Sequence, residues 1–223
     1  SAVSVVDTLS NEFLRALSNK EDAAYISGDG TSTYGSFTGL ASAVPSGTYQ
    51  ALTSGSATNW DSITLSDIDK CFAQVSSRAD TANFAILCSQ QFYFRVLHRL
   101  MRAAGGATIG EIRDGIRKSG ANFDAMFDGY PVVFSPHMPT SASGAATVLY
   151  VGDFKNGTKF GQVRNALEVG GSEHFAYNTD SFTVRGKNRV AILCHDVGVS
   201  STPGLVAAAP ATDKPTPHRP LPN

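Results

Sequence analysis

The stretch that decides the fold is the opening one, in which residues 3–35 read VSVVDTLSNEFLRALSNKEDAAYISGDGTSTYG. Polar residues separate apolar residues that recur every three or four positions, at Val6, Leu9, Phe13, Leu17 and Ala24. This spacing predicts one long amphipathic helix over about residues 3–25, with a single buried face.

The helix pattern runs into a glycine-rich turn at residues 28–35, and Gly28 marks the predicted helix end. A phosphate-binding loop follows a strand and opens a helix, so that the helix N-terminus faces the anion. Here the order is reversed, and no Gly-Lys-Ser/Thr sequence closes the loop. We therefore interpret Gly28, Gly30 and Gly35 as turn residues, and Asp29 as a turn former rather than a cation ligand.

The composition is that of a globular protein with a lightly charged surface. Its 223 residues, of which 42% are hydrophobic and 17% charged, suffice for one large domain or two smaller ones. A formal net charge of -1 does not favour binding to nucleic acid or to an anionic membrane. No apolar run reaches the roughly 18 residues that span a bilayer, and no signal peptide opens the sequence.

The three cysteines, Cys71, Cys88 and Cys194, are an odd number. We interpret them as buried free thiols in a reducing compartment rather than as a disulfide framework. Cys88 precedes a predicted helix N-terminus, which can lower a thiol pKa, but its apolar run favours a buried inert thiol.

The rest of the chain mixes helices and strands without a regular βαβ rhythm. Short extended pieces and turns are expected up to about residue 59, then a helix capped by Ser66 and another over residues 90–104 capped by Ser89. The predicted strands are residues 83–88, 130–134, 148–151, 159–169 and 182–194, and Asn156-Gly157 predicts a hairpin turn. The fold class is therefore α+β rather than doubly wound, and there is no internal repeat.

The tail from Ser200 differs in composition, because it holds prolines at positions 203, 210, 215, 217, 220 and 222. It is expected to be an extended or polyproline-like arm outside any core, held along its own domain or against a neighbouring copy.

No group of reactive side chains can be assembled from the sequence. The histidines are scattered without metal-ligand spacing: His98, His137, His174, His195 and His218. The adjacent pairs Glu173-His174 and His195-Asp196 point apart, so neither predicts an acid/base dyad. The motifs His-Glu-x-x-His, Gly-x-Ser-x-Gly and Cys-x-x-Cys do not occur. We therefore expect no catalytic, cofactor-binding or metal site.

A basic stripe at helical spacing is formed by Arg95, Arg99 and Arg102, near His98. It is interpreted as a solvated helix face or as a subunit contact through arginine forks, with nucleic-acid binding as a lesser alternative. The glycosylation sequon at residues 156–158 is interpreted only as a turn, because no secretory signal accompanies it.

Four segments, taken in order, resemble the major capsid proteins of tailed bacteriophages. They are EDAAYISGDGT at 21–31 with Tyr34-Gly35 and Gly39-Leu40, DGYPVVFS at 128–135 with Met138-Pro139, VLYVGDF at 148–154, and a closing region from SEHF at 172–175 through FTVR at 182–185 to Arg189. In that family a long helix ends in an acidic pair, an apolar stretch and a Gly-Asp/Asn-Gly-Thr turn. The matches span about residues 10–195 in the family's order.

The resemblance implies the Hong Kong 97 phage capsid fold, an α+β fold with a long spine helix, mixed sheets, and peripheral and axial domains. Carried onto this sequence, residues 1–27 and 172–198 form the peripheral domain, residues 28–171 the axial domain and residues 199–223 a Pro-rich C-terminal arm. Family members have an N-terminal arm and an extended loop before the long helix. This sequence begins at the helix, so both are expected to be absent from it.

The implied function is that of a major capsid protein of a phage or prophage, self-assembling into the hexamers and pentamers of an icosahedral head around double-stranded DNA. The alternative is an encapsulin-like nanocompartment shell; an uncharacterised enzyme, or a binding module that uses the Pro-rich tail, is a lesser alternative. Expected partners are other copies of the chain, with scaffold, maturation protease, portal and minor capsid proteins, DNA held non-specifically, and no membrane. The protein is expected to be made in the host bacterial cytoplasm, to reside in the virion, and to have neither enzymatic activity nor a cofactor.

Overall fold

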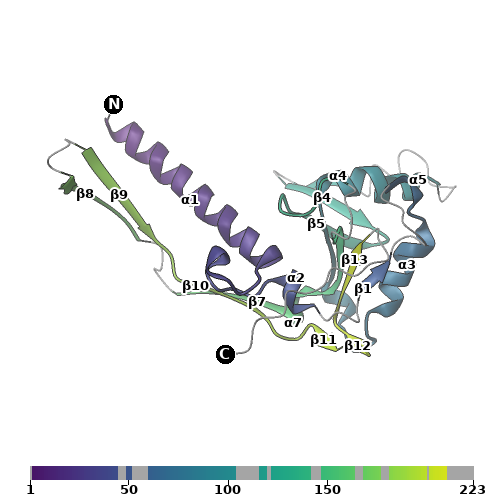
Figure 1. The fold of residues 1–223 in the computed structure, drawn as a ribbon. Coiled ribbons are helices and arrows are strands. Elements are labelled where there is room, and N and C mark those ends of the chain that lie inside the picture. The colour runs from purple at the N-terminus through teal and green to yellow at the C-terminus, as the bar shows by residue number, and fades with distance from the viewer. Residues whose placement is uncertain are drawn as a thin grey trace.

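The protein was analysed as a computed structural model, which describes residues 2–44, 49–51, 60–103, 116–119, 122–141, 147–163, 168–176, 181–199 and 201–209. A long helix and a set of narrow β-ribbons project to one side of a larger sheet that is covered by helices (Figure 1). We call the projecting part the arm; it is made of α1 Ala2–Ser27, β7 Thr158–Gln162, β8 Glu168–Ala176, β9 Ser181–Lys187 and β10 Val190–Cys194.

Helix α1 spans Ala2–Ser27, which confirms the predicted long helix. Its 26 residues make a rod about 39 Å long. Among the helix residues whose side chains the structure describes, the fully buried ones lie in the last turn, at Ala24 and Ile26, whereas Leu9 and Leu14 are 49% and 37% exposed. Phe13 and Leu17 of the predicted face are half-buried, so within a single chain that face is covered only in part, and Leu9 remains exposed.

Helix α1 ends where two glycines let the chain turn back against it. The Gly39 amide donates to the Gly28 carbonyl oxygen at 2.9 Å. A Cβ on Gly28 would lie 2.6 Å from the Phe37 carbonyl oxygen, and one on Gly39 would lie 2.6 Å from the Tyr25 carbonyl oxygen. Neither position has room for a side chain, so the contact requires glycine on both sides.

A seven-stranded mixed sheet forms the centre of the larger part, in the order β1-β13-β6-β2-β5-β4-β3. The strands are β1 Tyr49–Ala51, β2 Phe84–Cys88, β3 Ile116–Ser119, β4 Asn122–Phe127, β5 Tyr130–Phe134, β6 Leu149–Asp153 and β13 Leu205–Ala209. The β1–β13 and β2–β5 pairs are parallel, and the other pairs are antiparallel.

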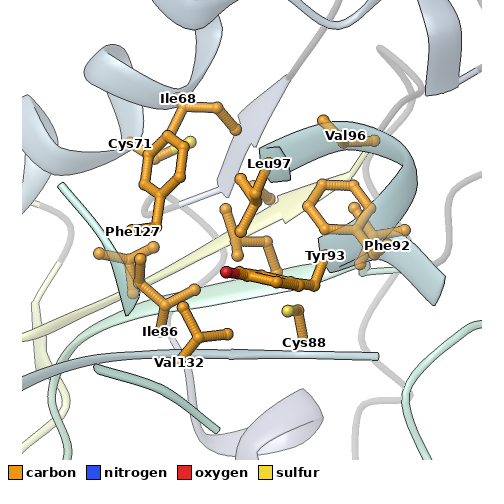
Figure 2. Close-up of a cluster of buried hydrophobic side chains, with 14 of the residues drawn as sticks. Ile68, Cys71, Ile86, Cys88, Phe92, Tyr93, Val96, Leu97, Phe127 and Val132 are labelled. Atoms are coloured by element: carbon orange, nitrogen blue, oxygen red, sulfur yellow. The ribbon is translucent and has the colours of Figure 1, made fainter. Parts of the chain in front are cut away.

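Both faces of the central strands are buried, because successive side chains on a strand alternate between faces. On one face Ile86 and Val151 join helix residues in the larger cluster, which Figure 2 shows. On the other face Leu87, Tyr150 and Leu205 pack with Ile26 of α1 and with α2. This arrangement explains why the central strands are continuous apolar runs in the sequence.

Short helices cover the face of the sheet that carries Ile86 and Val151. They are η3 Trp60–Ser62, α3 Leu65–Gln74, η4 Thr81–Asn83, and a helix made of α4 Gln90–Phe92, the π-helical turn η5 Tyr93–Leu97 and α5 His98–Ala103. The predicted cap at Ser89 is confirmed, since its hydroxyl accepts from the Phe92 amide at 3.2 Å. The predicted cap at Ser66 is wrong: Thr64 caps α3, in a capping box with Asp67.

The remaining elements are η1 Ser32–Tyr34, α2 Leu40–Ala43, α7 Phe154–Gly157, β7 Thr158–Gln162, β8 Glu168–Ala176, β9 Ser181–Lys187, β10 Val190–Cys194, β11 Gly198–Val199 and β12 Thr202–Pro203. Strand β7 pairs with β10, and β8 pairs with β9, each antiparallel. The predicted hairpin turn at Asn156-Gly157 is wrong, because both residues belong to α7. Asp153 caps that helix by accepting from the Asn156 amide at 3.1 Å.

The prediction that the tail from Ser200 lies outside any core is wrong for residues 205–209. Leu205–Ala209 is strand β13, paired with β6 on one side and β1 on the other, and Leu205, Val206 and Ala208 have no exposed surface. Five of the six prolines that suggested an arm follow this strand, at positions outside the described residues.

Candidate functional site

The glycine-rich turn after α1 is a structural loop whose polar groups bond to one another. The Asp29 carboxylate accepts from the Thr31 amide at 2.9 Å and from the Thr31 hydroxyl at 2.6 Å. A β-bridge joins Asp29 to Thr38. The interpretation of Asp29 as a turn former is therefore confirmed, and its carboxylate is engaged within the loop.

Two of the cysteines, Cys71 and Cys88, are buried free thiols, and we call them the two buried thiols. Burial raises the pKa of each to about 12, so both remain protonated and unreactive near neutral pH. Cys194 is free and half-buried, and burial raises its pKa as well.

The three histidines whose side chains the structure describes do not converge. The His137 ring and the Asn19 side chain are 2.9 Å apart (Nε2 to Oδ1), and His195 is exposed after β10. Burial, followed by the charge of Arg102, lowers the pKa of His98. The side chains of His174 and His218 lie outside the described residues. Among the described side chains, no three His, Cys, Asp or Glu residues gather where they could hold a metal ion.

The basic stripe is largely engaged inside its own chain. Arg99 donates to the carbonyl oxygens of Asp61 and Trp60, and to that of Ile63 at 2.7 Å. Arg95 lies over the Trp60 ring, 5.4 Å from its centroid. Two of the three arginines thus contact the η3 turn. Arg95 and Arg102 are nevertheless exposed, in keeping with the predicted solvated helix face, and the subunit contact stays a prediction.

A polar pocket of about 380 Å³ lies where β6, α7 and the β11–β12 ribbon meet, with Arg78, Asp153 and Asp196 among its lining residues. The buried Asp153 carboxylate accepts from the Asn156 side chain at 2.7 Å and from the Asp80 amide at 3.3 Å. These bonds give Asp153 a structural role at the end of β6.

The β-ribbons of the arm are held to α1 by a few specific contacts. Tyr25 Oη and Thr158 Oγ1 are 3.0 Å apart, and the Asn188 side-chain amide donates to Glu21 Oε1 at 2.6 Å. Phe13 packs on Gly186 of β9, where an added Cβ would lie 1.9 Å from Cε1 of the phenyl ring, so no side chain fits there. These contacts fix one face of the β-ribbons under α1 (Figure 1).

The arm also leaves large apolar side chains exposed. Phe160 and Val163 are each 57% exposed and Leu193 is 55% exposed, in addition to Leu9 and Leu14 on α1. Of these residues the sequence pattern singles out Leu9 alone. The apolar content of residues 160–163 and 190–194 predicts strands but does not indicate which faces of the strands are covered.

The architecture defines the class of protein. Two solved structures share it at low sequence identity. The capsid of an empty GTA particle matches with a TM-score of 0.58 and 18% identity, and the match covers 93% of this chain and 66% of that chain. The holo-SrpI encapsulin complex from Synechococcus elongatus PCC 7942 matches with a TM-score of 0.60 and 12% identity, and the match covers 95% of this chain and 68% of that chain. The fold is thus the α+β Hong Kong 97 capsid fold, and the chain spans about two thirds of the length of each of these proteins.

The phage capsid family matches residues 1–196, and the chain belongs to that family. It is therefore a capsid shell protein, as the sequence motifs indicated. A comparison with curated proteins finds no match. No helix among the described residues is long and apolar enough to cross a membrane.

Proposed function

We propose that this protein is the major capsid protein of a tailed phage or prophage, and that copies of it assemble into the hexamers and pentamers of an icosahedral head around double-stranded DNA. The supporting observation is the arm, a long helix over two-stranded ribbons with apolar side chains exposed on both layers. Such narrow ribbons are marginal by themselves, and clustered exposed apolar groups are typical of interaction surfaces. Contacts with neighbouring copies would cover them.

The division into peripheral and axial domains is part of this proposal. We assign α1 and the closing strands to the peripheral domain, and the seven-stranded sheet with its helices to the axial domain. The pairing of β7 with β10 favours a boundary near residue 157 rather than 171. The proline-rich residues 210–223 remain assigned to a C-terminal arm.

The proposed role is structural rather than enzymatic, and it needs no cofactor. Scaffold, maturation protease, portal and minor capsid proteins are proposed partners, and DNA would be held non-specifically, in keeping with the net charge of -1. Synthesis in the host bacterial cytoplasm and residence in the virion follow from the same proposal.

Electron microscopy of the full-length protein tests self-assembly. Closed shells, rings or sheets are expected. The substitution Leu14→Glu, which places a charge on an exposed apolar position, should reduce their number. Arg15→Gln is the matched control, because Arg15 neighbours Leu14 and forms only an exposed ion pair with Glu12. Monomers alone from the unmodified protein would contradict the proposal.

An encapsulin-like shell is the second candidate, favoured by the similarity to the SrpI encapsulin fold. Nuclease-treated particles distinguish the two functions by their contents. Protected double-stranded DNA supports a phage head, whereas a stoichiometric cargo protein without DNA supports a nanocompartment.

A further inference from the structure

Strand β7 lies at the edge of a sheet that contains only β7 and β10 within the described part of the chain. Residues 159–162 of β7 are all exposed, and Phe160 at the centre of the strand retains 57% of its surface. An uncovered strand edge is a template for pairing with another chain, so proteins usually shorten, charge or cover it. Beyond Thr158, whose amide already donates to the Phe154 carbonyl oxygen, this edge is therefore an interaction surface that the described backbone bonds within the chain do not use.

The register of the β7–β10 pair shows which backbone groups face outward. The Val163 amide donates to the Arg189 carbonyl at 3.2 Å, and the His195 amide donates to the Gly157 carbonyl at 3.1 Å. In an antiparallel ladder, residues bonded to the partner strand alternate with residues whose N–H and C=O point away from it. The residues of β7 that point toward the unpaired edge are Thr158, Phe160 and Gln162.

We propose that two copies of this chain pair along that edge, β7 against β7 and antiparallel, about a two-fold axis at Phe160. The inference rests on the proposed shell function and names one contact within it. In this register Phe160 of each copy lies opposite Phe160 of the other, and Thr158 lies opposite Gln162. The Phe160 pair exchanges two backbone hydrogen bonds. The Gln162 amide of each copy donates to the Thr158 carbonyl oxygen of the other, because the Thr158 amide is already bonded to the Phe154 carbonyl oxygen of its own chain. These bonds join the two ribbons into one four-stranded sheet.

The side chains of β7 suit this self-pairing. Directly opposed residues project to the same face, so the two Phe160 rings meet across the axis as an aromatic pair. Lys159 lies opposite Gly161 of the second copy, so no two lysines face each other. The Lys159 ammonium also donates to its own chain, to the Lys155 carbonyl at 2.6 Å. An isologous contact of this kind needs only one surface, present on both copies.

The opposite edge of the ribbon is less suited to a second copy. The central residue of β10, Ile192, is buried, whereas the opposed Phe160 on β7 is exposed. Leu193 of β10 is exposed as well, but it is paired with Lys159 and not with Phe160, so the exposed aromatic surface lies on the β7 side.

Cysteine cross-linking in the full-length protein tests the register. The background is Cys194→Ser, which removes the half-buried thiol and leaves the two buried thiols in place. Opposed residues in this register have Cα atoms about 5.5 Å apart, within the range of a disulfide. Phe160→Cys should form disulfide-linked dimers under mild oxidation of assembled particles. Gln162→Cys is the matched control, because the two copies of residue 162 would be about 14 Å apart and should not cross-link.

A second pair of variants tests the backbone contact. Phe160→Pro removes an outward N–H that β10 does not use, so the chain should fold with an unchanged melting temperature but lose particles. Phe160→Val keeps the N–H and the strand preference, and it should retain more particles.

The outcomes separate this inference from the proposed function. Particles with dimers specific to Phe160→Cys support the pairing. Particles without such dimers overturn the pairing and leave the shell function standing. Loss of particles in Phe160→Pro without Phe160→Cys dimers means that a different segment covers the edge, which also overturns the two-fold pairing. Failure of the unmodified protein to form particles overturns both.

Discussion

Replacing Leu205 by alanine tests whether the segment after residue 200 is part of the core. Leu205 has no exposed surface and belongs to the cluster that contains Ile26, Tyr150 and Val197. It packs closely on α7 of the same chain: a Cβ on Gly157 would lie 3.1 Å from the Leu205 Cδ1 atom. Little room is left for the surroundings to relax into the cavity, so the substitution should cost about 2–5 kcal/mol of unfolding free energy.

For a chain of this size, 1 kcal/mol shifts the melting temperature by about 2–4 °C, so a loss near 3 kcal/mol corresponds to about 6–12 °C. Calorimetry of Leu205→Ala measures this shift. Val199→Ala is the control, because Val199 is exposed and its truncation should cost within about 0.5 kcal/mol. Truncation after Ala209 should likewise preserve the melting transition, whereas truncation after Val199 removes β13 and should abolish it. Equal shifts for Leu205→Ala and Val199→Ala would refute the placement of β13 in the core.

Three further predictions concern the η3 turn, the thiols and the arm. Arg99→Ala should lower stability by about 1–3 kcal/mol in urea unfolding, because it leaves backbone carbonyls without their charged donor, whereas Arg102→Ala should leave the midpoint unchanged. The two buried thiols have pKa values raised from 9.0 to about 12, so they ionise first in the unfolded chain. Stability should therefore be full below about pH 9 and fall as the pH rises toward 12, by up to about 1.4 kcal/mol per pH unit for each thiol, and replacing both by alanine should flatten this dependence. Gly186→Val should displace Phe13 and speed amide exchange in α1, while Gly170→Val, where a Cβ meets nothing within 4 Å, should not; equal exchange in both variants would contradict the contact.

Local signals made part of this fold predictable. Helix α1 follows from its apolar spacing, and Ser89 from its position before a periodic segment. The α3 cap was misplaced because Ser66 and Thr64 are both good capping residues. The distinguishing feature is Asp67, which lies three residues after Thr64 and completes the capping box.

Features that depend on distant partners were not predictable. The Asn156-Gly157 dipeptide favours a hairpin in isolation, but Asp153 accepts the Asn156 amide and begins a helical turn instead. Residues 205–209 gave only a short apolar run beside a proline-rich segment, and their place between β1 and β6 depends on strands far away in the chain. The exposed edge of β7 was not predictable for the same reason: whether a strand lies at an edge depends on which distant strands pair with it.

The position of β13 has a consequence for the time course of folding. Strand β1 is paired with β13 alone in the described sheet. Tyr49 can therefore pair with Ala207 only after about 160 further residues have been synthesised. At ribosomal rates of about 5–20 residues per second, this delay is roughly 8–32 seconds. In the last part of that interval, after β6 has been synthesised, the nascent chain would expose the edge of β6 and the apolar groups that β13 later covers. A chaperone that shields this edge on the ribosome would therefore raise the yield of assembly-competent subunits without contacting the finished protein.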